Sequence, residues 1–138
     1  MSGLVLDASL ALQWFFEDET DRKYSLAVLA SLSQRRALVP LLWFYEVGNG
    51  LIVAHRRKRI SIQQIHAFLT RLRTLPIDSA PQSPADILEL PDFALSLGLT
   101  NYDAAYLNLA NRHHLPLATN DSALRRAAAS VGVTLANA

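Results

Sequence analysis

Short apolar runs alternate along the chain with longer segments whose apolar residues recur at helical spacing. The first run, Leu4 to Leu6, shows no polar alternation, which is typical of a strand buried on both faces of a parallel sheet. Four later runs have the same character, and the segments between them predict helices. The predicted strands are residues 4–6, 37–40, 75–77, 116–118 and 131–135, and the predicted helices are 21–36, 41–59, 62–72, 84–97, 100–114 and 120–130.

Residues that favour the start or the end of a helix set several of these boundaries. Thr20 is the predicted N-cap of the helix over 21–36, Pro84 suits the first position of its helix, and Gly98 ends that helix. Strands alternate with helices from end to end, which indicates an α/β fold with a parallel sheet covered on both faces. Because no linker, repeat or low-complexity segment interrupts the pattern, we expect a single domain over residues 1–138.

Composition narrows the possible chemistry. The chain has no cysteine, so disulfides, thiolate metal sites and cysteine nucleophiles are excluded, and a reducing compartment fits. A net charge of +1, from 13 Lys and Arg against 12 Asp and Glu, means that nucleic-acid affinity must come from local patches. Hydrophobic residues make up 51% of the chain, which points to an apolar surface buried against a partner.

Neither a targeting segment nor a membrane span is predicted. The N-terminal residues lack a basic region followed by a long apolar region, so we expect a cytoplasmic protein. The most membrane-like stretch, residues 37–54, contains Pro40, Glu46 and Gly48 and is too interrupted to span a bilayer. No membrane partner is therefore expected.

Candidate chemistry rests on carboxylates embedded in apolar sequence. Asp7 and Asp121 directly follow predicted strands, whereas Glu46 and Asp103 lie in predicted helices. In open α/β sheets, ligands bind just beyond the carboxyl ends of the strands. The topology would bring all four residues, called the four acids below, to one edge of the sheet.

Each of the four acids also has a purely structural interpretation. Asp7 could cap the next helix, and Glu46 could form an internal ion pair with an arginine. Asp103 has the spacing of a capping box with Thr100.

Asp121 could likewise cap a helix, with Thr119 or Asn120 competing for that position.

Several carboxylates at one site repel each other, so the group requires a hard divalent cation. Mg²⁺ or Mn²⁺ fits, because both prefer oxygen ligands. Zinc fits poorly, since there is no cysteine and since His113 and His114 are adjacent and diverge on a helix.

Four ordered motifs carry a family resemblance. They are Leu6-Asp7-Ala8-Ser9, Glu46-Val47-x-Asn49, Leu99-Thr100-x-Tyr102-Asp103-Ala104-Ala105-Tyr106 and Leu117-Ala118-Thr119-x-Asp121. Over essentially its whole length, the chain resembles the PIN-domain ribonucleases, and in particular the VapC-type toxins of toxin–antitoxin pairs. This resemblance implies a three-layer α/β/α sandwich with strand order 3-2-1-4-5.

The resemblance also assigns roles. It implies a site for Mg²⁺ or Mn²⁺ in which Asp7, Glu46, Asp103 and Asp121 hold the ion and catalyse RNA hydrolysis, with Asn49 and Thr119 supporting them. Asn120 stands where some relatives carry another acid, which leaves one or two metal ions open. It further implies a homodimer and a larger complex with an antitoxin, one segment of which inserts into a groove beside the site and often presents an arginine to the acids.

An RNA substrate needs phosphate contacts, and the densest basic run follows the Glu46 helix. Its possible RNA contacts are Arg56, Arg57, Lys58 and Arg59. The structural alternative is that cations are favoured at a helix C-terminus. Tyr102 and Tyr106 could stack on bases, although packing in the helix core is the expected role.

Two further surface features are predicted. Residues 17–21 are acidic and are expected to form a solvated helix start rather than a metal site. The aromatic runs 14–16 and 43–45 are too bulky for one small core to accommodate comfortably, so part of them is expected at a partner surface.

Two other functions remain open at this stage. One is a PIN nuclease of RNA processing or DNA repair without a toxin role. The other is a catalytically silent binding module in which the four acids are structural.

Overall fold

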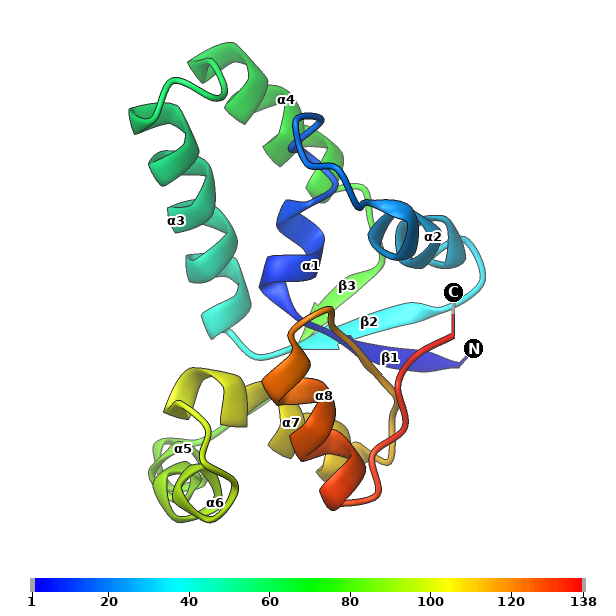
Figure 1. The fold of residues 1–138 in the computed structure, drawn as a ribbon, viewed down its shortest axis with the longest axis vertical. Coiled ribbons are helices and arrows are strands. Elements are labelled where there is room, and N and C mark those ends of the chain that lie inside the picture. Colours follow the sequence, from blue (N-terminus) through cyan, green and yellow to red (C-terminus); the bar gives the residue numbers. More distant parts are fainter. Residues whose placement is uncertain (1, 138) are drawn as a thin grey trace.

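The computed structural model describes residues 2–137 and consists of three layers (Figure 1). The strands are β1 (Gly3–Leu6), β2 (Arg36–Val39), β3 (Ile77–Ser79) and β4 (Leu117–Ala118). The helices are α1 (Ala8–Leu12), α2 (Lys23–Ser31), α3 (Leu42–Arg56), α4 (Ile62–Leu72), α5 (Pro84–Leu88), α6 (Leu90–Leu97), α7 (Asn101–His113) and α8 (Ser122–Ser130). Figure 1 shows α1 to α4 on one side of the sheet and α5 to α8 on the other, which confirms the predicted α/β/α sandwich.

The sheet is parallel throughout and has the order β3-β2-β1-β4. Its centre is β1, in which Val5 lies opposite Leu38 of β2 on one side and opposite Leu117 of β4 on the other. The predicted order of the first four strands is therefore correct. Since β1 and β4 are neighbours that come from distant parts of the chain, the winding of the sheet reverses between them.

The predicted fifth strand over 131–135 is wrong as a full strand. It is reduced to a single parallel bridge between Leu117 and Leu135, on the outer side of β4. Gly132 adopts a left-handed conformation with φ of 76° just after α8 ends. Because the chain is still turning there, pairing begins only where the Leu117 N–H donates to the Thr134 carbonyl at 2.9 Å.

Burial in the core confirms the prediction that the first strand is buried on both faces. Leu4, Val5 and Leu6 are all fully buried, so β1 contacts helices on both faces. A fully buried leucine or valine contributes about 1.5–3 kcal/mol relative to an exposed one. This burial holds the carboxyl end of β1, and with it Asp7, in a fixed place.

Aromatic packing partly corrects the prediction of a crowded core. Trp14, Phe15 and Phe16 are all at most 7% exposed, and the Phe15 ring stacks on Phe68 with centroids 4.5 Å apart. The core therefore accommodates the first aromatic run completely. In the second run only the first residue, Trp43, is buried.

Helix α3 is not buried nearly all round, contrary to the interpretation of its apolar sequence. Trp43, Val47 and Leu51 form the buried face, whereas Tyr45 is 79% exposed and Ile52 is exposed as well. The reason is that only one side of α3 faces α1 and the sheet. Its other side leaves apolar side chains on the surface.

Two boundaries differ from the predicted ones because of proline. The predicted helix over 84–97 divides into α5 and α6 at Glu89, since Pro91 lies in the first turn of α6. In a continuous helix its ring would clash with the Ile87 carbonyl, and it could not donate a hydrogen bond. Strand β3 begins at Ile77 rather than at residue 75, although the Pro76 carbonyl already accepts from the Ala37 N–H at 2.9 Å.

Thr20 does not cap the second helix. Helix α2 begins at Lys23 with Arg22 at the N-cap position, and no side chain caps it. Arg22 instead donates from Nε to the Gln13 carbonyl at 2.8 Å and from Nη2 to the Trp14 carbonyl at 2.9 Å. It thereby satisfies the carbonyls of two residues that directly follow α1.

Finally, no helix within residues 2–137 is both long enough and apolar enough to cross a membrane.

Candidate metal centre

Asp7 lies where β1 ends and α1 begins, and it is only 5% exposed. Its Oδ1 accepts from the Ser9 N–H at 3.3 Å, and its Oδ2 accepts from the Ser9 hydroxyl at 2.7 Å. The helix-capping interpretation of Asp7 is therefore correct, although the presence of the other acids had argued against it. Capping and a site role are compatible, because these bonds orient the carboxylate without neutralising its charge.

Thr119 joins the ends of the two central strands. It is completely buried, and its hydroxyl donates to Asp7 Oδ2 at 2.7 Å. The Thr119 hydroxyl oxygen also accepts from the Asp121 N–H at 3.1 Å. One hydroxyl therefore links both acids that follow strands, and the supporting role that the family resemblance implies for Thr119 stays a prediction.

Asp121 is the N-cap of α8, and its Oδ1 accepts from the Leu124 N–H at 2.8 Å. The structural interpretation of Asp121 is correct as well, and neither Thr119 nor Asn120 takes that position. The Asn120 side chain instead donates to Gln13 Oε1 at 3.2 Å and accepts from Arg125 Nη2 at 3.3 Å.

Glu46 is half-buried in the second turn of α3, and it forms no ion pair with any residue among 2–137. The Tyr106 hydroxyl of α7 donates to Glu46 Oε1 at 2.5 Å. The alternative of an internal ion pair with an arginine is therefore wrong. Tyr106 is buried in the core as expected, but its contact with Glu46 was not predicted, because the apolar spacing of α7 signals only packing.

Asp103 lies in the first turn of α7, behind the N-cap Thr100. The Asp103 N–H donates to the Thr100 hydroxyl at 3.1 Å. Among residues 2–137, the Asp103 carboxylate makes no return bond to the Thr100 backbone, so half of the predicted capping box forms. The carboxylate remains available to the site.

Electrostatic repulsion couples the four acids to one another. Burial raises the pKa of Glu46, and repulsion from Asp7 and Asp103 raises it further, against the lowering effect of the Tyr106 hydrogen bond. Burial also raises the pKa of Asp103, with added repulsion from Asp7 and Asp121. No arginine or lysine within residues 2–137 pairs with any of the four.

These residues fit a hard divalent cation in their chemistry. They supply carboxylate oxygens, a threonine hydroxyl and no sulfur, and their mutual repulsion favours an added positive charge. In the described part of the chain, no three His, Asp or Glu side chains lie close enough together to hold a metal ion between them. Mg²⁺ does not require such a group of three, because it retains several waters and binds through one or two carboxylates.

Helix starts surround the same point. Asp7 caps α1, Thr100 caps α7 and Asp121 caps α8, and Glu46 is near the start of α3. Partial positive charge at these helix N-termini stabilises carboxylates and phosphate groups. The backbone therefore compensates part of the repulsion among the four acids.

Asn49, the other predicted supporting residue, forms no hydrogen bond with the four acids within residues 2–137. Its side chain is exposed and forms no hydrogen bond with any other residue of that range either. A supporting role for Asn49 stays a prediction. Ser9, which bonds Asp7 through both its N–H and its hydroxyl, was not predicted as part of the site.

The basic run lies at the other end of α3. Arg56 follows Glu46 by ten residues, which corresponds to about 15 Å along the helix axis. Arg56, Arg57 and Lys58 are exposed, with Lys58 in a left-handed conformation. Any contact of these residues with RNA would be away from the four acids.

Arg59 has a structural role instead. It pairs with Asp18 at 2.7 Å and with Glu19 at 3.5 Å, and its guanidinium lies over the Phe16 ring. These contacts attach the acidic 17–21 segment to the end of α3. The segment is solvated, as expected, but it does not start a helix, because α2 begins only at Lys23.

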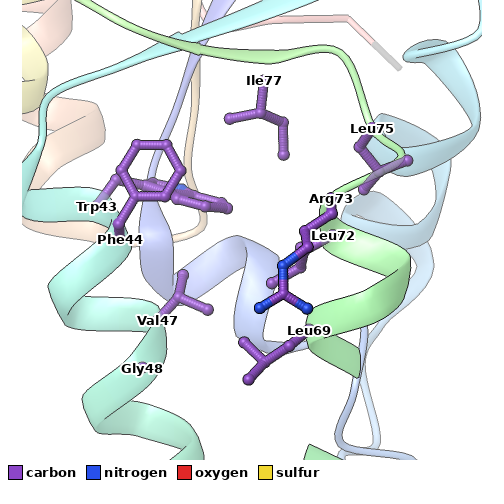
Figure 2. Close-up of a pocket in the computed structure, with 9 residues that line it drawn as sticks. All are labelled: Trp43, Phe44, Val47, Gly48, Leu69, Leu72, Arg73, Leu75 and Ile77. Carbon is purple, nitrogen blue, oxygen red and sulfur yellow. The ribbon is translucent and has the colours of Figure 1, made fainter. Parts of the chain in front are cut away.

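An apolar groove of about 320 Å³ lies between α3 and α4 (Figure 2). Its walls include Phe44, Val47 and Leu69, with Arg73 as its charged side chain. Trp43 also lines it, and within residues 2–137 its buried Nε1 has no hydrogen-bond partner. None of the four acids lines this groove, although Glu46 is on the same two turns of α3.

Comparison with known proteins identifies the family. The model of the PIN domain matches residues 4–130, so the chain belongs to the PIN domain family, whose members are generally nucleases. Among solved structures, PAE2754 from Pyrobaculum aerophilum is similar, with a TM-score of 0.69 and 26% identity over 91% of this chain and 84% of that one. FitAcB from Neisseria gonorrhoeae shares the fold, with a TM-score of 0.64 and 17% identity over 97% of this chain and 96% of that one. No curated protein matches the sequence significantly.

The raised pKa of Glu46 leads to a prediction for the metal-free protein. A carboxyl whose pKa is higher in the folded state contributes stability that is complete below its ordinary pKa of 4.5 and is lost as the pH rises through the raised value. Glu46→Gln, which cannot ionise, is therefore expected to unfold at a temperature a few degrees above the wild type at pH 7 and at a similar temperature at pH 4. Calorimetry in EDTA measures both midpoints.

Asp86→Asn provides a control of opposite sign. Hydrogen bonds from Ser83 lower the pKa of Asp86, so its contribution is present above the ordinary pKa of 3.8 and is lost as the pH falls. The unfolding temperature of Asp86→Asn at pH 7 should therefore not rise above that of the wild type. If Glu46→Gln unfolds at pH 7 at no higher temperature than the wild type, repulsion among the four acids is too weak to affect the stability of the fold.

Proposed function

We propose that this PIN domain is a Mg²⁺- or Mn²⁺-dependent endoribonuclease of the cytoplasm that acts as the toxin of a type II toxin–antitoxin pair, with one domain spanning residues 1–138. The observation that carries the proposal is the convergence of the four acids without an ion-paired arginine or lysine among residues 2–137. A nuclease family and a chain with no cysteine both agree with metal-assisted hydrolysis at carboxylates.

Each acid is proposed to have a defined task. Asp7, Asp103 and Asp121 hold the ion, directly or through water. Glu46 either ligates it or acts as a base that orients the attacking water. When bound, the ion supplies Lewis-acid chemistry, which lowers the pKa of water and stabilises charge on the phosphate.

The remaining contacts keep these groups in place. The Thr119 hydroxyl and Ser9 hold the Asp7 carboxylate, so its orientation does not depend on a bound ion. The starts of α7 and α8 attract the negative phosphodiester to the same point. Arg56, Arg57 and Lys58 are proposed to contact RNA away from the scissile bond.

Metal removal tests the activity. Single-stranded RNA incubated with the purified chain is expected to be cleaved in Mg²⁺ or Mn²⁺, to survive in excess EDTA, and to be cleaved again when Mn²⁺ is restored. Binding should also stabilise the fold, by about 2.7 kcal/mol when free Mn²⁺ is 100 times its dissociation constant. Cleavage that persists in excess EDTA would contradict the metal-dependent mechanism.

The alternatives predict different results in the same experiments. A silent binding module would cleave no RNA and, if the acids are only structural, would gain no stability from Mn²⁺. A nuclease of RNA processing or DNA repair would show cleavage without growth arrest on expression. Arrest by the wild type, relieved by Asp103→Asn, is the result expected of a toxin.

The apolar surfaces are proposed to be covered by partners. We assign the groove between α3 and α4 to a segment of the antitoxin, whose apolar side chains would fill it. A carboxylate of the same segment could pair with Arg73, and an acceptor could satisfy Trp43 Nε1. Exposed apolar side chains at the start of α3 and on α5 are proposed to form the homodimer contact, namely those of Leu41, Tyr45, Ile87 and Leu88.

Gly48 offers a way to block the groove from within. A methyl group added at Gly48 would meet nothing within 4 Å, so a larger side chain can enter the groove without disturbing the core. Gly48→Phe is expected to weaken binding of the antitoxin at least about tenfold, or about 1.4 kcal/mol, while RNA cleavage remains. Gly48→Ala is the matched control, and pull-down with titration calorimetry provides the measurement. Unchanged affinity of Gly48→Phe would place the antitoxin elsewhere.

A further inference from the structure

The hydroxyl of Tyr106 donates its proton to an acid of the site, and the Ala8 backbone N–H lies close enough to the same hydroxyl to lower its pKa. Tyr106 is 1% exposed and belongs to the core, yet its hydroxyl donates to Glu46 Oε1, 60 positions earlier in the chain. A buried hydroxyl is costly without an acceptor, and one that donates to a carboxylate forms a strong, charge-assisted bond. Packing of the ring alone does not account for this contact.

Glu46 depends on Tyr106 for its orientation. Within residues 2–137, no other side chain and no backbone group bonds the Glu46 carboxylate. Repulsion from Asp7 and Asp103 would otherwise favour rotamers that turn it towards solvent, since the side chain is only half-buried.

One helix face therefore controls two of the acids. Asp103 and Tyr106 are three residues apart on α7, so both side chains lie on the same face of that helix. Helix α7 presents Asp103 directly and holds Glu46 of α3 through Tyr106. The separation between these two acids is set by a hydrogen bond across the gap between the two helices.

We propose that Tyr106 is a positioning residue, which holds the Glu46 carboxylate by Oε1 and leaves Oε2 free to face the metal ion or the attacking water. The inference rests on the proposed metal-dependent function. Tyr106 itself touches neither the ion nor the substrate. It acts only through Glu46, and this property separates it from an ordinary core residue.

Tyr102 provides a matched control on the same helix. It lies one turn before Tyr106 but is 61% exposed, and its hydroxyl has no hydrogen bond within residues 2–137. Tyr106→Phe and Tyr102→Phe therefore make the same chemical change. Only the first removes a donor from Glu46.

The test measures Mn²⁺ affinity by electron paramagnetic resonance of the free ion in five proteins: the wild type, Tyr106→Phe, Tyr102→Phe, Glu46→Gln and the double variant Tyr106→Phe/Glu46→Gln. Loss of a group that orients a metal ligand typically weakens binding about 10- to 100-fold. Tyr106→Phe is expected to weaken Mn²⁺ binding by at least about tenfold, and Tyr102→Phe to leave it unchanged. In the Glu46→Gln background, Tyr106→Phe is expected to have no further effect.

Two results would overturn the inference while leaving the proposed function intact. They are wild-type affinity in Tyr106→Phe, and an equal loss with and without Glu46, which is what a merely structural role produces. If the wild type itself bound no Mn²⁺, the proposed function would fail, and the inference with it.

A measurement on the unmodified tyrosine guards against misfolding of Tyr106→Phe. In a chain labelled with ¹³C at tyrosine Cζ, the Tyr106 resonance is expected to move in Glu46→Gln, whereas the Tyr102 resonance stays in place. An unmoved Tyr106 resonance would show that the two side chains do not interact, and would also overturn the inference.

Discussion

Asp7→Asn is expected to lower Mg²⁺-dependent RNA cleavage by at least about 100-fold, because loss of a group that merely orients a metal ligand already costs about 10- to 100-fold. The substitution removes one negative charge at the centre of the proposed site and changes the side chain by a single atom. Initial cleavage rates at saturating Mg²⁺, compared with the wild type, provide the measurement.

The fold should survive this substitution. Asparagine is as good an N-cap as aspartate, so α1 can still begin at residue 8. Ser9 and Thr119 both donate to Asp7 Oδ2, and a hydroxyl can reverse its role if an amide nitrogen replaces that oxygen. The unfolding temperature is therefore expected to fall by only a few degrees.

Asp92→Asn is the matched control, since Asp92 is an exposed acid in the first turn of α6. It should retain wild-type activity. If Asp7→Asn is as active as Asp92→Asn, the carboxylate of residue 7 is only a helix cap.

Thr119→Val is expected to reduce both stability and activity. The variant keeps the shape of a completely buried, β-branched side chain but removes the hydroxyl that joins Asp7 to Asp121. The Asp121 N–H loses its acceptor, and Asp7 loses one donor, so we expect a loss of about 1–3 kcal/mol in the free energy of unfolding. Cleavage should fall by about 10- to 100-fold, because the orientation of two proposed ligands is relaxed.

Thr119→Ser separates the hydroxyl from the methyl group. Serine retains both hydrogen bonds and loses only packing, so most of the activity should return even if some stability is lost. Denaturant unfolding and cleavage rates, measured on the same preparations, provide the comparison. Equal activity of the valine and serine variants would argue that the Thr119 hydroxyl has no part in the site.

Local patterns were sufficient for much of the fold. The unbroken apolar character of Leu4 to Leu6 predicted a central strand buried on both faces, and the alternation of strands and helices predicted the parallel sheet. Other predictions failed for two reasons. Either a residue that cannot continue a helix was overlooked, or a side chain formed hydrogen bonds with residues distant in the sequence. Pro91 divided a helix by its covalent geometry, whereas the start of α2 moved from Thr20 to Arg22, whose side chain bonds distant carbonyls that no spacing rule contains.

For the candidate site as well, local sequence patterns predicted some features and contacts between distant residues decided the others. That Asp7 and Asp121 come together follows from parallel strands ending at one edge, so the sequence was informative about them. Glu46 and Asp103 were recognisable as acids in apolar surroundings, but their partners were not. An ion pair with arginine and a hydrogen bond from Tyr106 would each give the Glu46 carboxylate a partner, and only the tertiary structure, which places the Tyr106 hydroxyl beside Glu46, selects between them.

By itself, the sequence determined the class of fold, the order of the first four strands through its family resemblance, and that Asp7 and Asp121 lie beyond the ends of neighbouring strands. It could do so because periodicity, capping and strand ends are local properties of a chain. The tertiary structure alone decided that one buried threonine joins two acids, that Tyr106 holds a third, and that Arg59 is engaged with Asp18 instead of being free for RNA. The physical reason is that a hydrogen bond or ion pair depends on distances of about 3 Å between side chains far apart in sequence, which packing sets and local pattern does not.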